Sequence, residues 1–269
     1  MKRSAEMAPL SAAAASTLRA VRGLFFDIDD TFTTDGQITK EAFSALWRAR
    51  AAGLVLVPIT GRPAGWADHI ARMWPVDGVV AENGAMACYL KDGKLRCTYL
   101  LDASARARNR RKLDRLREEI LAAVPGAGLA SDQPYRLFDL AIDFCEDVPP
   151  LPAEDVHKIV SLFERRGATA KVSSIHVNGW FGDYDKLGMC RRFAREVLGV
   201  DLDRQRRRYL FAGDSPNDAP MFGYFPNSVG VANVRRFADQ LDARPRFVTR
   251  GRSGRGFAEL VRAVLRARV

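Results

Sequence analysis

The sequence predicts an α/β protein whose main domain is a doubly wound parallel sheet, with an α+β cap domain inserted into it. Two blocks of the chain, residues 22–84 and 184–269, alternate short apolar runs with helical patterns, which is typical of parallel βαβ units. Between them, residues 85–183 change to a hairpin pattern, partly alternating strands and two helical segments. At 269 residues the chain is long enough for one large and one small domain.

The elements of the first block follow from its apolar runs and stop signals. Strands are expected at residues 23–26, 54–59 and 78–81, because each run is short and apolar. Residues 41–52 place apolar side chains at a helical spacing, and Gly53 follows as a stop signal. Pro63 lies near the first turn of the next helix, where its missing N–H is tolerated.

The insertion and the second block are assigned from the same signals. In the insertion, Asp92-Gly93 is expected to turn a hairpin over residues 88–96. The remaining elements expected there are helices at 103–124 and 153–166 and strands at 137–145, 168–173 and 175–181. The second block is expected to hold a helix after Lys186, strands at 209–212, 228–231 and 246–249, and a final helix at 256–266.

Three carboxylates, from Asp27, Asp29 and Asp30, follow the first apolar run within four residues. In open α/β sheets the ligand crevice lies at the carboxyl ends of the strands, where these acids are expected. Carboxylates that cluster there repel one another unless a cation lies between them, and hard oxygen ligands suit Mg²⁺. A loop of solvated acids after a core strand remains the alternative on this segment alone.

Three later segments favour a phosphate site. Thr60, Gly61 and Arg62 end the second apolar run, where a hydroxyl, close backbone N–H groups and a guanidinium can bind phosphoryl oxygens. Lys186 begins a helical pattern far along the chain and offers a point charge.

The third segment contains Asp214, Asn217 and Asp218, just after another apolar run. Asp214 and Asp218 are four residues apart and would share one face of a helical turn. A helix-capping turn after Pro216 is the alternative interpretation of Asn217 and Asp218.

Together these residues resemble the motifs of the haloacid dehalogenase superfamily, in particular its capped sugar-phosphate phosphatases. The first motif, Asp-x-Asp-x-Thr, is matched by Asp27, Asp29 and Thr31. The other three motifs are matched by Thr60, by Lys186, and by Gly213, Asp214 and Asp218. The resemblance runs from about residue 23 to the C-terminus, with one departure at Asp30, where these phosphatases usually carry Gly.

The resemblance implies a Mg²⁺-dependent phosphomonoester hydrolase that acts on a sugar phosphate. Asp27 would be the nucleophile that forms an aspartyl-phosphate, and Asp29 would act as general acid and then base. Thr60 and Lys186 would position and neutralise the transferring group. The residues implied to hold Mg²⁺, directly or through an ordered water, are Asp27, Asp29, Asp214, Asn217 and Asp218.

Substrate contacts are expected on both sides of the phosphate. On the core side the expected contacts are Gly61, Arg62 and Asn83, together with Thr60 and Lys186. In the resemblance, residues 85–183 are the substrate-selecting cap, whose candidate contacts are His176, Asn178, Trp180 and Tyr184. The alternative for this group is structural, with Trp180 packing the hinge and His176 a satisfied core residue.

Composition argues against a nucleic-acid-binding protein and against a membrane-spanning protein. The net charge of +10 comes mainly from Arg spread along the chain, and the basic runs lack interleaved aromatics, so nucleic acid is not expected as a partner. No segment approaches a membrane span. The Ala-rich residues 1–21, interrupted by Glu6 and Pro9, are expected to be a mobile tail. The expected partner is a small phosphorylated metabolite, bound by a monomer or homodimer.

The four cysteines show no Cys-x-x-Cys spacing, which favours reduced, buried thiols and a cytoplasmic location. Two rival functions remain. A phosphotransferase or phosphomutase on the same scaffold would pass the phosphoryl group to a second hydroxyl. A non-catalytic basic binding protein would keep the fold without the reaction.

Overall fold

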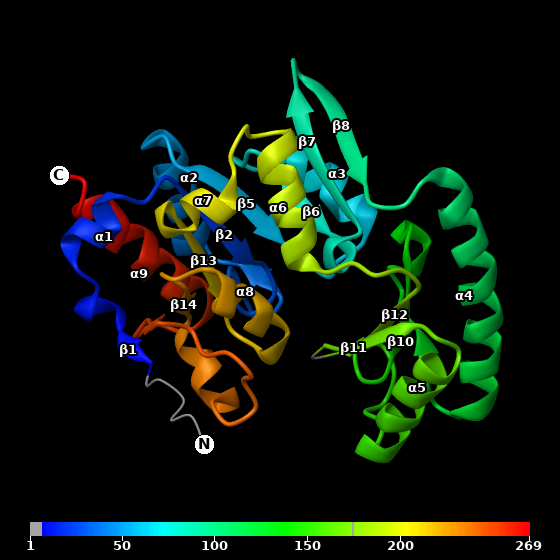
Figure 1. Ribbon diagram of the computed structural model, residues 1–269. Helices are drawn as coiled ribbons and strands as arrows, with labels where there is room; N and C mark the ends of the chain where they lie inside the picture. Colours follow the sequence, from blue (N-terminus) through cyan, green and yellow to red (C-terminus); the bar gives the residue numbers. More distant parts are fainter. Residues whose placement is uncertain (1–6, 174) are drawn as a thin grey trace.

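The computed structural model describes residues 7–173 and 175–269, which form one large sheet and one small one (Figure 1). The large sheet has nine strands in the order β1 (Ala8–Pro9), β15 (Phe247–Val248), β14 (Val229–Gly230), β13 (Tyr209–Gly213), β2 (Gly23–Asp27), β5 (Val55–Ile59), β6 (Val79–Ala81), β7 (Met86–Lys91) and β8 (Lys94–Tyr99). The strands are parallel from β1 to β6, and β7 and β8 are antiparallel. The predicted fold class is therefore confirmed.

Helices cover both faces of this sheet, which explains why its central strands are apolar throughout. One face carries α1 (Ala15–Arg19), α2 (Lys40–Ala51), α3 (Ala64–Met73) and α9 (Ser253–Arg266). The other face carries α6 (Lys186–Glu196), α7 (Leu202–Gln205) and α8 (Ala219–Tyr224). Neighbouring residues of β2 pack into the hydrophobic cores on opposite faces of the sheet. The ring centroid of Phe26 lies 4.8 Å from that of Phe257 on one face, and the ring centroid of Phe25 lies 5.6 Å from that of Phe225 on the other.

The inserted segment forms a separate antiparallel sheet with its own core (Figure 1). Its strand order is β11 (Thr169–Val172), β12 (His176–Trp180), β10 (Asp139–Asp143) and β9 (Gly128–Leu129). The helices α4 (Ala103–Ala123) and α5 (Ala153–Arg165) pack on one face through Leu140, Ile142 and Val177. Along β10 and β12 the alternate residues, among them Asp139, His176 and Asn178, therefore point to the other face.

The remaining elements are short. A two-stranded ribbon joins β3 (Thr33–Thr34) to β4 (Gln37–Ile38). The 3₁₀ turns are η1 (Leu10–Ala12), η2 (Glu82–Gly84), η3 (Gln133–Tyr135), η4 (Arg206–Arg208), η5 (Pro216–Asp218) and η6 (Ala232–Phe237). Of the helices in residues 7–173 and 175–269, none combines the length and the apolar character that a membrane crossing needs.

The prediction of a mobile N-terminal tail over residues 1–21 is wrong for residues 7–21. Strand β1 pairs with β15, with Ala8 opposite Phe247. The side chains of Leu10 and Leu18 are buried in the core beside α9. Two buried leucines anchor an otherwise weakly hydrophobic segment, which its composition does not reveal. Residues 1–6 lie outside the described residues.

The hairpin at residues 86–99 extends the large sheet rather than the small one. Its turn is the predicted one, since Asp92 and Gly93 have φ values of 52° and 71°. Strand β7 pairs with β6, so the insertion leaves the large sheet only after Tyr99, and the expected boundary at residue 85 is corrected to that extent. The division of the chain into two domains otherwise remains a prediction.

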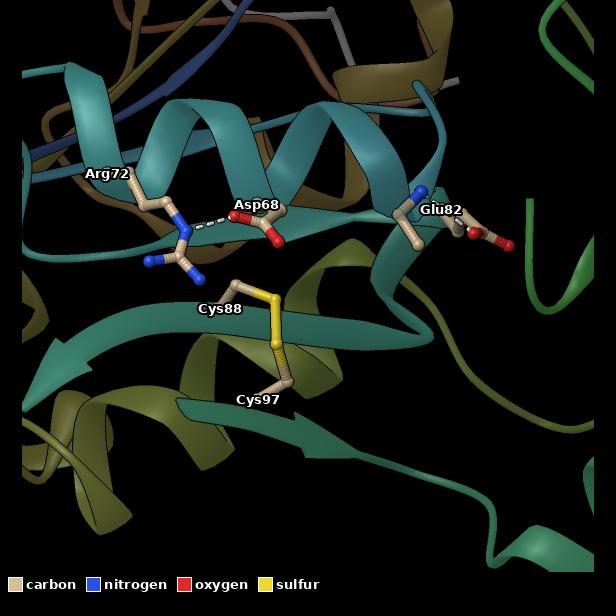
Figure 2. The surroundings of a disulfide bond; sticks show 6 residues. Asp68, Arg72, Glu82, Cys88 and Cys97 are labelled. Atoms are coloured by element: carbon tan, nitrogen blue, oxygen red, sulfur yellow. Dashed lines mark hydrogen bonds and ion pairs between the residues drawn. A yellow bond between two sulfur atoms is a disulfide. The ribbon is translucent and has the colours of Figure 1, made fainter. Parts of the chain in front are cut away.

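Cys88 and Cys97 form a disulfide across this hairpin (Figure 2). They lie directly opposite each other in the register, with Cα atoms 4.3 Å apart. Such pairing follows from the strand register and has no signature in cysteine spacing, so the prediction of reduced thiols is wrong for these two residues. Among the described strands β8 pairs only with β7, and the disulfide therefore fastens the strand that leads into α4.

Candidate active site

Three carboxylates meet at the carboxyl ends of the two central strands. Asp27 ends β2, Asp214 follows β13, and Asp218 ends η5. One oxygen from each lies within 4.8 Å of the others, and all three residues are buried. Because β2 and β13 are parallel neighbours, their ends bring together residues that are far apart in the chain.

Lys186 supplies a positive charge to this cluster. Its Nζ lies 2.6 Å from Asp27 Oδ1 and 3.3 Å from Asp218 Oδ1. Lys186 is the first residue of α6, whose start is capped by Asp185 accepting from the Gly188 N–H at 2.6 Å. Gly84 packs against this point with φ of 101°, and a Cβ there would lie 2.0 Å from Asp185 O. Only glycine allows η2 to lie this close to the base of Lys186.

Asp214 and Asp218 are oriented by hydrogen bonds. Thr31 Oγ1 donates to Asp214 Oδ1 at 3.0 Å, and Asn233 Nδ2 donates to Asp214 Oδ2 at 3.2 Å. Asp218 Oδ2 accepts from the backbone N–H of Asp214 at 3.0 Å. Sequence reasoning did not find Asn233, because it lies in η6 with no strand-end or spacing signal around it.

The electrostatics of the cluster fit a small cation. Burial raises the pKa of Asp27 well above its usual value, and the acids Asp218, Asp214 and Asp29 add to this while Lys186 opposes it. Burial and then Asp218 raise the pKa of Asp214 to about 8. Lys186 provides one positive charge against three buried carboxylates, and its own pKa is raised by Asp27 and Asp218 despite its burial. A set of oxygen donors with this surplus of negative charge fits Mg²⁺.

The end of β5 forms the neighbouring part of the site. Thr60 is fully buried, and its Oγ1 accepts from the Arg62 N–H at 2.9 Å and lies 3.4 Å from Asp29 Oδ2. Arg62 Nε donates to Asp29 Oδ1 at 3.1 Å. Asp29 is therefore held on the side of Thr60 and Arg62, apart from the three buried acids.

Two tight turns, at Asp30 and at Asn83, form the rest of the site on the large sheet. Asp30 has φ of 55°, a left-handed conformation that explains why glycine is favoured at this position. It is held by Asn233 Nδ2, which donates to Asp30 O at 2.9 Å. Asn83 also has φ of 55°, and its amide packs so closely on Gly61 that a Cβ on Gly61 would lie 3.0 Å from Asn83 Oδ1.

Glu82 and Arg136 join the two sheets. Glu82 reaches from the large sheet to the small one, and Arg136 reaches from the small sheet to the large one. The buried Glu82 carboxylate accepts from the N–H groups of Ala64 at 2.9 Å and of residues 137, 138 and 139 at 2.7, 2.6 and 3.2 Å. Arg136 Nη1 donates to Gly61 O at 3.0 Å and to the Asp139 carboxylate. The start of β10 is thus fixed to the loop that carries Thr60 and Arg62. Neither residue was predicted, because the partners that link the two sheets lie more than 50 residues away along the chain.

The predicted contacts on the small sheet lie on one face of β12. His176 Nε2 lies 2.8 Å from Glu146 Oε2, and Asn178 Nδ2 donates to Asp139 Oδ2 at 3.1 Å. Trp180 stacks on Tyr184 with ring centroids 5.6 Å apart. Within the described residues, the Trp180 Nε1 and Tyr184 hydroxyl atoms are buried without a hydrogen-bond partner. All of these groups are buried or part-buried, and their contact with a substrate stays a prediction.

Asn217 makes a second contact between the two sheets, apart from the one formed by Glu82 and Arg136. Its Nδ2 donates to Val172 O of β11 at 3.2 Å, and its side chain is outside the group of Asp27, Asp214 and Asp218. Its predicted part in metal binding stays a prediction, while its observed contact fixes the small sheet against η5.

We expect Lys186→Met to lower kcat/KM by about 10²–10³-fold for every phosphate ester, because the lost charge is the one expected to face the phosphoryl group that all esters share. Met keeps the length of the side chain and its packing. Lys94→Met, which removes the same charge from the exposed strand β8, is the matched control and should keep wild-type activity. Steady-state kinetics on two unrelated esters checks this, and a selective loss on one of them would contradict it.

A second prediction concerns pH and the Glu82 contact. Burial, with help from Asp139, raises the pKa of Glu82 to about 7, although three backbone N–H groups lower it. Between pH 4.5, the pKa of Glu82 in the unfolded chain, and about pH 7, folding therefore takes up a proton. The stabilisation from Glu82 is complete below this pH window and is lost as the pH rises through it.

The test compares urea unfolding of the wild type and of Glu82→Gln between pH 4.5 and 8. The free energy of unfolding of the wild type should fall, relative to that of Glu82→Gln, as the pH rises to 7. Above pH 7 the difference between the two should stay constant. Contributions from the titrating Asp27 and Asp214 cancel in the difference. A difference that is constant with pH would show that Glu82 does not titrate in this window.

Comparisons with known proteins show what this chain is similar to. A family model described as haloacid dehalogenase-like hydrolase matches residues 24–113. A curated protein named phosphoglycolate phosphatase, from Pyrobaculum neutrophilum, is 29% identical over 246 residues, which is 90% of this chain and 95% of that protein. These matches confirm the predicted family resemblance and the prediction of an enzyme.

Two solved structures share the fold. The C-terminal domain of trehalose-6-phosphate phosphatase from C. albicans superposes with a TM-score of 0.71 at 14% identity, covering 98% of this chain and 99% of that one. Sucrose-phosphatase from Synechocystis, in complex with sucrose and phosphate, superposes with a TM-score of 0.62 at 16% identity, covering 91% and 98%. At such identities these structures bear on the fold alone.

Proposed function

From its resemblance to the haloacid dehalogenase-like hydrolases, we propose that this chain is a Mg²⁺-dependent phosphomonoester hydrolase that acts on a sugar phosphate through an aspartyl-phosphate. The observation that carries the proposal is the position of Asp27. Its carboxylate lies at the carboxyl end of β2, in contact with Lys186 and within 4.8 Å of two further acids. A binding protein needs no such concentration of buried charge.

Asp27 attacks phosphorus, and the bond to the leaving oxygen breaks, which gives an aspartyl-phosphate and an alcohol. Asp29 protonates the leaving oxygen and then removes a proton from the water that hydrolyses the intermediate. Its hydrogen bonds to Arg62 and Thr60 support this role, because they hold its carboxyl group at the end of β5 without joining it to the buried cluster.

The phosphoryl group would lie among Thr60, Lys186 and the backbone around Gly61. Lys186 neutralises negative charge that the transferring group carries, and the Thr60 hydroxyl is available to a phosphoryl oxygen. Asp27, Asp214 and Asp218 would hold the Mg²⁺ with Asp29 through its backbone carbonyl, and Thr31 and Asn233 would orient Asp214. When bound, Mg²⁺ would offset the surplus negative charge of the site and of the phosphate ester.

A small phosphorylated metabolite, in particular a sugar phosphate, is the proposed substrate. Support comes from the family resemblance, which is to capped sugar-phosphate phosphatases, and from the polar face of the small sheet. A cytoplasmic location belongs to the same proposal. The Cys88–Cys97 disulfide counts against it, because disulfides persist mainly in oxidising compartments.

The test is a panel of sugar phosphates, polyol phosphates, nucleotides and one small aryl phosphate, assayed with Mg²⁺ for release of inorganic phosphate. We expect release from several esters, with sugar phosphates preferred. Adding an unphosphorylated sugar as acceptor separates hydrolysis from phosphoryl transfer. Formation of a new sugar phosphate in place of inorganic phosphate would establish the phosphotransferase alternative, and no reaction with any ester would refute the proposal.

A further inference from the structure

A buried aspartate builds a rigid turn at the edge of the small sheet. Asp143, the last residue of β10, is 1% exposed and accepts hydrogen bonds from three successive backbone N–H groups. The donors are Cys145 at 2.9 Å, Glu146 at 2.7 Å and Asp147 at 2.8 Å. A carboxylate with three such donors fixes the backbone of the turn, and with it the direction in which the Cα–Cβ bond of Glu146 leaves the turn.

The Glu146 side chain points from this turn toward the core. Its Oε2 lies 2.8 Å from Nε2 of the buried His176, and its Oε1 lies 3.9 Å from Nη1 of Arg62. The side chain remains 34% exposed, so a ligand can reach it. Asp132 lies at nearly the same distance from Arg62, 4.0 Å.

The charges around Arg62 leave Glu146 poorly compensated. Arg62 makes its short contact with Asp29 at 3.1 Å, and it also lies 4.0 Å from Asp132. Asp132 has its own cation, since Arg136 donates to both of its oxygens at 2.8 Å. Among the described residues Glu146 also contacts His176, whose pKa is lowered first by burial, so burial disfavours a compensating positive charge on its ring. Glu146 therefore keeps a net negative charge at the edge of the site.

The position of Glu146 relates it to the leaving group rather than to the phosphate. Arg62 lies between Asp29, which is the proposed general acid, and Glu146. The oxygen that Asp29 protonates belongs to the leaving alcohol, so the rest of that alcohol extends to the same side. A carboxylate there accepts hydrogen bonds from hydroxyl groups and repels a second anionic group.

Resting on the proposed phosphatase function, we propose that Glu146 is a specificity-determining residue, which selects neutral, hydroxyl-bearing leaving groups and rejects leaving groups that carry a carboxylate. The chain would differ in this from its relative named phosphoglycolate phosphatase, because phosphoglycolate carries a carboxylate. The selectivity comes from a fixed negative charge and not from the shape of the site. Removing the charge should therefore improve the poor substrates more than it weakens the good ones.

The test uses two substrates that differ at one group. Glycerol 3-phosphate ends in a neutral CH₂OH, where 3-phosphoglycerate carries a carboxylate. We expect the wild type to prefer glycerol 3-phosphate in kcat/KM, and Glu146→Gln to reduce that preference about tenfold, the scale of one partly solvated charge contact. The change should arise mainly from a lower KM for 3-phosphoglycerate, because the repulsion acts on the bound substrate as well as on the transition state.

Two further variants keep the test decisive. Glu146→Asp keeps the charge and should keep most of the preference, while Asp147→Asn removes a charge from the exposed neighbour in the same turn and should leave the preference unchanged. Equal effects of Glu146→Gln on both substrates, including a uniform loss, would overturn the proposal. Failure of the wild type to hydrolyse either substrate and a small aryl phosphate would instead refute the phosphatase function, so the two failures are distinguishable.

Discussion

Replacing Asp27 by Asn is expected to lower kcat/KM by about 10⁴-fold or more, which is the scale of a lost nucleophile. Asn has nearly the same shape but neither the negative charge that attacks phosphorus nor a second anionic oxygen for Mg²⁺. The fold should survive, because burial, helped by Asp218, Asp214 and Asp29, raises the pKa of Asp27 and so disfavours the charge that the substitution removes.

The control is Asp239→Asn, at a fully exposed aspartate, which should keep wild-type activity. Circular dichroism and thermal unfolding establish that the Asp27→Asn protein is folded. Mass spectrometry of acid-quenched enzyme should detect a phosphorylated peptide containing Asp27 in the wild type and none in the variant. Substantial turnover by the folded variant would contradict the assignment of the nucleophile.

Removal of divalent cations is expected to reduce phosphate release to the background rate, and Mg²⁺ should restore it. The reason is the charge of the site, where Lys186 offers one positive charge to a group of three buried acids before the ester adds its own charge. Asp214→Asn should raise the Mg²⁺ concentration for half-maximal activity by about tenfold or more, since a ligand is lost. Full activity in excess chelator would contradict the metal assignment.

The same site predicts how Mg²⁺ binding depends on pH. Burial raises the pKa of Asp214 to about 8 in the metal-free protein, so Mg²⁺ must displace a proton to bind at pH 7. Calorimetric titration should therefore show an affinity that rises with pH up to about 8 and a proton released on binding. An affinity independent of pH between 6 and 8 would show that Asp214 is already ionised.

The acids at the strand ends could be predicted because a parallel sheet imposes a simple rule. A buried strand is apolar along its whole length, so the first polar side chains after it lie at the edge of the sheet. Asp27, Thr60 and Asp214 each follow such a run, and the structure brings all three to one edge. Lys186 was found by its place at the start of a helix.

The residues that sequence reasoning missed act through partners distant in sequence. Glu82 binds the backbone of residues 137–139, Arg136 binds Gly61 O, and Asn233 binds both Asp30 O and Asp214. No local pattern signals a bond to a backbone group 55 residues away. The disulfide was missed for a related reason, because the pairing of Cys88 with Cys97 depends on the register of the hairpin.

The neighbouring positions of β2 and β13 also bear on how the protein folds. The hydrogen bond from Thr31 to Asp214 joins residues 183 positions apart, and β13 is needed to complete the centre of the large sheet. During synthesis, β2 and β5 emerge early, but the strand that flanks β2 on its other side emerges only after the entire insertion. Contacts of such long sequence separation form slowly and leave apolar strand edges exposed meanwhile. A ribosome-bound chain that stops before residue 209 is thus expected to lack a closed core, even though the small sheet and its helices are already complete.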